Sequence, residues 1–396
     1  MTSEVPYKIN VSAEQLALLK AKLELAVMPD ELEDVGWDYG APLDDITRLT
    51  KHWKSDFDWR KHETAFNNAL PQFTRDIEVE GHGKLNIHYV HQQSDVQGAI
   101  PLLFVHGWPG SVLEVLKVLP LLTKKSSAMP SFHVVAYSLP GFGFSEGARK
   151  KGFGVQKMAE VGHKLMLALG YDQYVVQGGD WGFWITQRIA SDYGVKHCMA
   201  WHTNMPCPDF TRTKVTSLPV SEEEQPGLQR TLEIDRTGRA YGSIQETKPQ
   251  TIGYALADSP VGLLAWIYEK LVAWADAYPW TDDEVLTWVS MYWFSRAGPA
   301  ASVRIYRESV YPTREIPPDP AHAPSIPMGM SSFPGDIYAY PKSWKHTLGN
   351  VVFEAEHKSG GHFAAYERPQ TLVGDLQAMF GKGGPAYAVV LGKDGY

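Results

Sequence analysis

Residues 171–184 read YDQYVVQGGDWGFW, and this stretch decides the fold of the chain. The β-branched run at 174–176 predicts a short strand, and the glycines that follow predict a sharp turn into a helix. Strand, glycine, polar residue and glycine in this order are typical of the elbow that presents a nucleophile on an α/β sheet. Serine is the most familiar central residue, whereas this chain has Asp180. Asp180 could instead cap the helix that starts at 181, but the small flanking residues favour the elbow.

Composition and charge exclude several classes of protein. The chain has 396 residues, 44% of them hydrophobic, and a formal net charge of −8, so it lacks the basic surface of a nucleic-acid-binding protein. Its two cysteines, Cys198 and Cys207, provide neither a disulfide framework nor a cysteine-based metal site. The N-terminal residues do not resemble a signal peptide, and no run approaches the roughly 18 apolar residues of a membrane span. We therefore expect a soluble, cytoplasmic protein that does not bind membranes.

The distribution of apolar residues predicts one α/β core that is interrupted by helices. Residues 1–75 contain no clear strand and predict a helical meander, whose first helix follows a capping box at Ser12 and Gln15. Residues 76–207 alternate strands with helices, which predicts a mostly parallel sheet covered on both faces. The strands of this first part are expected at 84–92, 101–107, 132–141, 173–177 and 197–202, and its helices at 155–169 and 181–193.

The alternation stops after the strand at 197–202. Residues 208–312 are helical and aromatic, which predicts a lid inserted into the core, and a proline-rich stretch follows at 311–327. The second part of the core, residues 313–396, is expected to contain a strand at 351–356 and a last helix near 370–381. No structure is predicted for the tail at 383–396.

The segment FVHGWPGS, residues 104–111, ends another predicted strand and opens a helix. The backbone N–H of Trp108 could lie beside that of Trp181, and two such donors would form an oxyanion hole. His106 could act as a base, but we favour a role in holding the loop through hydrogen bonds.

A histidine and an acid are expected from the segments near the C-terminus. SGGHFAAYERP, residues 359–369, places His362 on a loop after the last strand, and a catalytic histidine follows the nucleophile and the acid in hydrolases with this elbow. Asp336, in SSFPGDIYAY, is the first candidate for the acid. Glu356 is the second, because it alternates with Glu354 along the strand at 351–356 and could be a surface group.

Taken together, these motifs resemble those of epoxide hydrolases with the α/β-hydrolase fold. The resemblance rests on GGDWG at 178–182, HGWP at 106–109 and GGHF at 360–363, in that order. The meander and the segment at 244–270 are similar to the microsomal-type branch, in particular to its soluble fungal and bacterial members. The resemblance extends from about residue 5 to about 381. The animal members carry an N-terminal membrane anchor, and the chain departs from them there.

The resemblance implies an activity and a set of site residues. Members convert an epoxide and water into a diol without a cofactor or metal, and they often form homodimers. The implied residues are Asp180 as nucleophile, His362 as base, Asp336 as its acid partner, the backbone N–H groups of Trp108 and Trp181 as oxyanion hole, and Tyr241 and Tyr306 of the lid as ligands of the epoxide oxygen.

An aspartate suits this chemistry because a carboxylate is ionised at neutral pH and can attack a saturated carbon without a base. Two alternative functions are compatible with the same fold. A haloalkane or haloacid dehalogenase also pairs an aspartate with a histidine, but its halide needs no proton from the tyrosines. A catalytically silent ligand-binding protein would be expected to lack Asp180, His362 or a lid tyrosine, and all are present.

Overall fold

The computed structural model describes residues 4–208, 214–315 and 323–396. A single nine-stranded sheet lies at its centre, in the order β1-β2-β3-β5-β4-β6-β7-β8-β9. The pairings from β5 to β9 are all parallel, whereas β1, β2 and β3 add an antiparallel edge. The strands are β1 (Val5–Pro6), β2 (Gln72–Val79), β3 (Gly83–Gln92), β4 (Ile100–Val105), β5 (Phe132–Tyr137), β6 (Tyr174–Gly178), β7 (Cys198–Thr203), β8 (Pro327–Ser332) and β9 (Asn350–Glu356).

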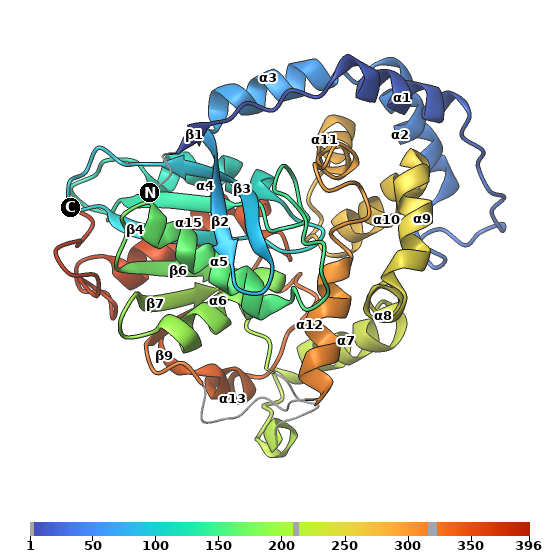
Figure 1. Ribbon diagram of the computed structural model, residues 1–396. Helices are drawn as coiled ribbons and strands as arrows, with labels where there is room; N and C mark the ends of the chain where they lie inside the picture. The colour runs from blue at the N-terminus through green and yellow to red at the C-terminus, as the bar shows by residue number, and fades with distance from the viewer. Residues whose placement is uncertain (1–3, 209–213, 316–322) are drawn as a thin grey trace.

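Helices cover both faces of this sheet, as the alternation of strands and helices predicts (Figure 1). Helices α5 and α6 pack together on one face, and α4, α14 and α15 pack together on the other. The core helices are α4 (Val115–Leu122), α5 (Val155–Ala168), α6 (Trp181–Tyr193), α13 (Lys342–Lys345), α14 (Ala364–Glu367) and α15 (Pro369–Phe380), with the short 3-10 turns η1 (Val112–Glu114) and η4 (His346–Leu348).

A second group of helices, the lid, stands beside the sheet between β7 and β8 in the chain (Figure 1). Its members are η2 (Lys214–Ser217), α7 (Gln225–Thr237), α8 (Ala240–Thr247), α9 (Pro249–Asp258), α10 (Pro260–Ala273), α11 (Asp282–Trp293) and α12 (Arg304–Glu315). Helix α12 continues past residue 312, and part of the proline-rich stretch, residues 316–322, lies outside the described residues. Within the described part of the chain, no helix is both long and apolar enough to cross a bilayer.

The N-terminal helices connect the sheet to the lid. Figure 1 shows α1 (Ala13–Glu24), α2 (Leu43–Ser55) and α3 (Trp59–Ala69) as an arch from the sheet edge to the lid. Helix α1 contacts α10, α2 contacts both α10 and α11, and α3 contacts α11. The arch is anchored at its start by β1, which pairs with β2. The expectation that residues 1–75 contain no strand is therefore wrong at both ends of the segment.

Strand β8 is missing from the sequence-based prediction for a physical reason. Its sequence PMGMSS has no β-branched residue, so it lacks the usual strand signal. The strand forms because it is buried between β7 and β9. Gly329 has to be small there, since a Cβ atom at this position would lie 2.4 Å from Met379 Sδ and 2.7 Å from His202 Cδ2.

The C-terminal tail packs against the loops that precede β4 and β5. The N–H of Gly395 donates to the carbonyl of Gly98 at 2.8 Å, and the N–H of Ser131 donates to the carbonyl of Gly395 at 2.9 Å. Because these loops enter the parallel strands, the tail lies at the opposite end of the sheet from the turn that carries Asp180.

Candidate active site

Asp180 occupies a strained turn between β6 and α6. Its backbone has φ 52° and ψ −130°, in the half of conformational space that side chains rarely enter. Its side chain makes no cap hydrogen bond to α6, so the elbow describes this turn better than a helix cap does. The turn closes only around glycines. A Cβ atom on Gly178 would lie 2.4 Å from the carbonyl oxygen of Gly182, and one on Gly182 would lie 2.0 Å from that of Val105.

The carboxylate of Asp180 is held from two sides. Its Oδ1 accepts a hydrogen bond from the backbone N–H of Trp108 at 2.7 Å, and its Oδ2 lies 3.4 Å from His362 Nε2. Gly107 allows this approach, because a Cβ atom there would be 2.1 Å from Oδ1. Trp181 is the first residue of α6, so its backbone N–H belongs to the helix end that has no partner within the helix.

Asp336 is the carboxylate that faces His362. The two side chains meet at 2.7 Å between His362 Nδ1 and Asp336 Oδ1, and both are buried. The alternative acid, Glu356, points away from the site: its side chain is 63% exposed and lies 3.7 Å from Lys345 Nζ. The side chain of Asp336 is only 2% exposed. The loop after β8 therefore brings Asp336, the first candidate for the acid, to His362. Strand β9 does not bring Glu356, the second candidate, to the histidine.

The two aspartates change the proton affinity of His362. Burial alone would lower the pKa of its imidazole, but the charge of Asp336 and the hydrogen bonds to Asp180 and Asp336 outweigh burial and raise the pKa to about 10. At neutral pH the resting site therefore holds an imidazolium between two carboxylates. Such a cation cannot accept a proton until one of the two negative charges is removed.

His106 has the structural role favoured from the sequence. Its Nδ1–H donates to the carbonyl of Gly107 at 3.0 Å, and its Nε2 accepts from the N–H of Leu139 at 3.2 Å. Burial lowers the pKa of His106 to about 4, so the ring is neutral and both nitrogens are engaged. The residue fixes the loop that presents the Trp108 N–H.

Tyr241 and Tyr306 reach the site from lid helices α8 and α12. Their rings lie 5.8 Å apart in a T-shaped arrangement. Both contact Trp108: Tyr241 stacks on its ring at 5.3 Å, and Tyr306 meets it edge-on at 5.8 Å. Tyr306 also packs against Trp181 at 4.8 Å. Burial and, among the nearby charges, that of Asp180 raise the pKa of both phenols well above the ordinary value, so both keep their protons.

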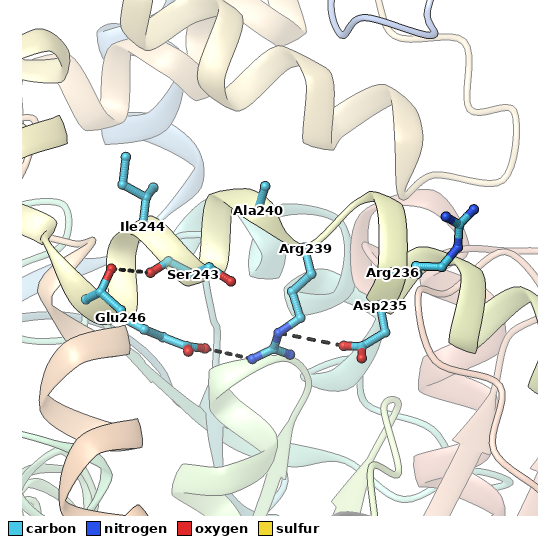
Figure 2. A pocket seen from close by; sticks show the side chains of 8 residues that line it. Asp235, Arg236, Arg239, Ala240, Ser243, Ile244 and Glu246 are labelled. Carbon is cyan, nitrogen blue, oxygen red and sulfur yellow. Dashed lines mark hydrogen bonds and ion pairs between the residues drawn. The ribbon is translucent and has the colours of Figure 1, made fainter.

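An arginine connects the start of α8 to the loop that follows Asp336. Figure 2 shows Arg239 in a shallow surface hollow of α7 and α8, between Asp235 and Glu246. Its Nη2 donates to Glu246 at 2.7 Å, and its Nη1 donates to the hydroxyl of Tyr338 at 3.0 Å. Because Tyr241 lies two residues after Arg239, this bridge fixes the tyrosine relative to the acid loop.

The chain is similar to known proteins over most of its length. Residues 4–115 match the family model described as epoxide hydrolase N terminus, and residues 100–262 match that of the alpha/beta hydrolase fold. Epoxide hydrolase 1 of Sus scrofa is 32% identical over 95% of this chain and 88% of its own length. The chain belongs to the epoxide hydrolase family. Two solved epoxide hydrolase structures also match closely in fold.

The epoxide hydrolase of Aspergillus niger has a TM-score of 0.83 and 36% identity, over 95% of this chain and 96% of its own. The juvenile hormone epoxide hydrolase of the silkworm Bombyx mori has a TM-score of 0.85 and 30% identity, over 95% of this chain and 93% of its own. The fold expected from the sequence, the α/β-hydrolase fold, is thereby confirmed.

Two residues that the motifs do not reveal support His362 in this epoxide hydrolase. Glu367 accepts the backbone N–H groups of Gly361 at 3.1 Å and Phe363 at 2.9 Å, and so holds the turn on both sides of the histidine. The carbonyl of Trp274, at the end of α10, accepts the N–H of His362 at 2.8 Å. The Trp274 contact joins segments that only the fold brings together, whereas Glu367 lies only four residues after Phe363 in the chain.

Within the described ranges, no group of three or more His, Cys, Asp or Glu side chains is placed to hold a metal ion.

The turn at Asp180 should not tolerate a methyl group at Gly182. We expect Gly182→Ala to lower the free energy of unfolding by about 1–3 kcal/mol, because the new Cβ meets the backbone of β4. Gly374→Ala is the matched control in α15, where a Cβ meets nothing within 4 Å and should stabilise by about 0.4–1 kcal/mol. Urea unfolding measures both, and an equally stable Gly182→Ala protein would contradict the close packing.

Asp336 should determine the proton affinity of His362. We expect Asp336→Asn to lower the pKa of His362 from about 10, and Glu356→Gln to leave it unchanged. Nitrogen-15 NMR of the imidazole ring measures this pKa directly. A larger shift in Glu356→Gln than in Asp336→Asn would contradict the assignment.

The pairing of His362 with Asp336 should also make the free energy of unfolding depend on pH. Because folding raises the pKa of His362 above its ordinary value of 6.5, its contribution to stability is complete below pH 6.5 and is lost as pH rises through about 10. Unfolding free energies of Asp336→Asn should change less over this range than those of the wild type.

Proposed function

We propose that this epoxide hydrolase opens its substrate through an ester between the substrate and Asp180. One observation carries the proposal. The Asp180 carboxylate lies at a strained turn with Oδ1 on the Trp108 N–H and Oδ2 toward His362. This arrangement supplies a nucleophile, one donor of an oxyanion hole and a base at a single carboxyl group.

Ring opening would use Asp180 and the lid tyrosines. Since Oδ1 is engaged by Trp108, Oδ2 is the oxygen that attacks one epoxide carbon from the side opposite the C–O bond. A new O–C bond forms, the C–O bond of the epoxide breaks, and its electron pair moves to the epoxide oxygen. Tyr241 and Tyr306 hold their protons at neutral pH, so they can donate hydrogen bonds and a proton to that oxygen.

Hydrolysis of the ester would use His362. Esterification removes the negative charge of Asp180, which is one of the causes that raise the pKa of His362, so this pKa falls once the ester has formed. His362 then gives up its resting proton, which replaces the one that the tyrosines passed to the epoxide oxygen. The neutral imidazole takes a proton from water while Asp336 keeps the ring oriented. The water oxygen attacks Cγ of Asp180, and the oxyanion forms on Oδ1 next to the backbone N–H groups of Trp108 and Trp181.

The last step restores the enzyme. The C–O bond between Cγ and the substrate breaks, and the proton on His362 passes to the departing oxygen, which completes the diol. The proton left on the Asp180 carboxyl group then passes to His362, so that the carboxylate and the imidazolium are both restored. Family membership and the two buried phenols favour this reaction over dehalogenation, because a halide leaving group needs no proton donor. The intact set of Asp180, Asp336 and His362 likewise disfavours a silent ligand-binding protein.

Two substitutions test the covalent mechanism. Asp180→Ala should abolish diol formation from styrene oxide, because no other group attacks the carbon. His362→Gln should still form the ester but not hydrolyse it, so that intact-protein mass spectrometry finds the enzyme with one substrate added. Circular dichroism checks that both variants are folded. Undiminished turnover by Asp180→Ala would contradict the assignment of the nucleophile.

The lid tyrosines are tested at the first step alone. Tyr241→Phe and Tyr306→Phe should each slow ester formation by roughly 10²-fold, the usual cost of one donor to a developing oxyanion. Tyr254→Phe is the matched control, since this lid tyrosine is 70% exposed on α9 and should leave the rate unchanged. Rapid quenching followed by mass spectrometry gives the rate. Unchanged ester formation in both phenylalanine variants would rule out their role as donors.

A further inference from the structure

A small, partly open space lies beside the Asp180 carboxylate. Asp180, His362, Glu114 and Asn204 line it together with the glycines of the two catalytic turns. The centre of a water molecule can move within about 10 Å³ of this space, so it accommodates about one water and no epoxide. A buried water also needs two to four polar partners, and these four side chains can supply them. The space therefore fits the water that the hydrolysis step requires.

Glu114 reaches this space because Gly110 has no side chain. A Cβ atom on Gly110 would lie 1.8 Å from Glu114 Oε1 and 3.2 Å from the carbonyl oxygen of Gly107. Likewise, a Cβ atom on Gly107 would lie 2.1 Å from Asp180 Oδ1. Two glycines, three residues apart in one loop, thus each make room for a carboxyl oxygen. The hydroxyl of Tyr292, on α11, donates to the carbonyl of Gly110 and fixes this part of the loop.

The protonation of Glu114 also differs from that of an ordinary surface glutamate. Burial raises the pKa of its carboxyl group to about 8, against the positive charge of His362, which lowers it. A neutral carboxyl group beside Asp180 adds no third negative charge to the site. Its carbonyl oxygen can still accept a hydrogen bond, and neither ring opening nor the charge balance of the ester assigns it any task.

We propose that Glu114 is a further catalytic residue, whose carboxyl group binds the water that hydrolyses the Asp180 ester and aims it at Cγ together with His362. The proposal rests on the ester mechanism described above. The water gives one proton to His362 Nε2, and its second O–H donates to the carbonyl oxygen of Glu114. As the water oxygen bonds to Cγ and the C–O bond to the substrate breaks, the proton on His362 moves to the departing oxygen. Glu114 gains and loses no proton.

A purely structural role for Glu114 makes a different prediction. Ser111 begins the short turn η1, its hydroxyl accepts the N–H of Leu113 at 3.2 Å, and the backbone of Ser111 also bonds to the Glu114 carboxyl group. If Glu114 served only this turn, its loss would lower stability and affect ester formation and hydrolysis alike. A water-binding role affects hydrolysis alone.

The test compares three variants in single-turnover reactions with styrene oxide, quenched rapidly and followed by intact-protein mass spectrometry. Glu114→Met keeps the length of the side chain but loses the acceptor, and it should slow ester hydrolysis roughly 10- to 100-fold with ester formation unchanged. The ester should then accumulate during steady turnover. Glu114→Gln keeps a carbonyl oxygen and should recover most of the hydrolysis rate. Ser111→Ala weakens the turn without touching the small space, so it should lower the melting temperature and leave hydrolysis unchanged.

Several outcomes would overturn the proposal. Glu114→Met could hydrolyse the ester at the wild-type rate, could slow both steps equally, or could match Glu114→Gln. A different result would contradict the ester mechanism itself. If His362→Gln never carries substrate and a single turnover in oxygen-18 water labels only the diol, both the ester mechanism and the role of Glu114 are wrong. If His362→Gln accumulates the ester and Glu114→Met does not, only the role of Glu114 is lost.

Discussion

The strained turn at Asp180 is the constraint on which the rest of the site depends. A residue with a side chain is held at positive φ where the central strand β6 meets α6, and no side chain fits at Gly178 or Gly182. The neighbouring backbone approaches so closely that the Trp108 N–H reaches the Asp180 carboxylate. Such strain persists only where the surrounding structure leaves no alternative. The six parallel strands and the helices on both faces provide that rigidity.

The charges of the groups around this turn are balanced against one another. His362 lies between two carboxylates and is protonated at rest, so in the proposed mechanism it becomes a base only when ester formation removes the charge of Asp180. Glu114, in the same small space, is kept neutral by burial. The proposed mechanism thus ties water activation to the formation of the ester, and the resting enzyme avoids three carboxylates ionised side by side.

The lid and the N-terminal arch complete the site from outside the core. The lid supplies two phenols that pack on Trp108, and Arg239 fixes one of them to the loop after Asp336. The end of α10 holds the backbone of His362 through the carbonyl of Trp274. Helices α1, α2 and α3 in turn contact α10 and α11, so the arch sets the position of the lid relative to the sheet.

The sequence by itself determined the elements with strong local signals. The β-branched run before the GGDWG turn, the glycine pair before His362 and the order of the motifs depend on residues close together in the chain, so the core strands, the order of the site residues and the fold could be predicted. Strand β8 could not, because its small, unbranched residues become a strand only through burial between β7 and β9. The choice between Asp336 and Glu356 likewise depended on which loop faces the histidine.

Glu114 and Glu367 illustrate the same limit, since nothing in their local sequence distinguishes them from the other glutamates of the chain. Glu114 gains its environment from burial and from the charges of His362 and Asp180, and Gly110 leaves room for its carboxyl group. Glu367 accepts the N–H groups of Gly361 and Phe363 from the turn just before α14, and that of Asp276 from a distant segment of the chain. Proton affinity and hydrogen bonding of this kind arise from burial and from distant charges, and only the tertiary structure decides them.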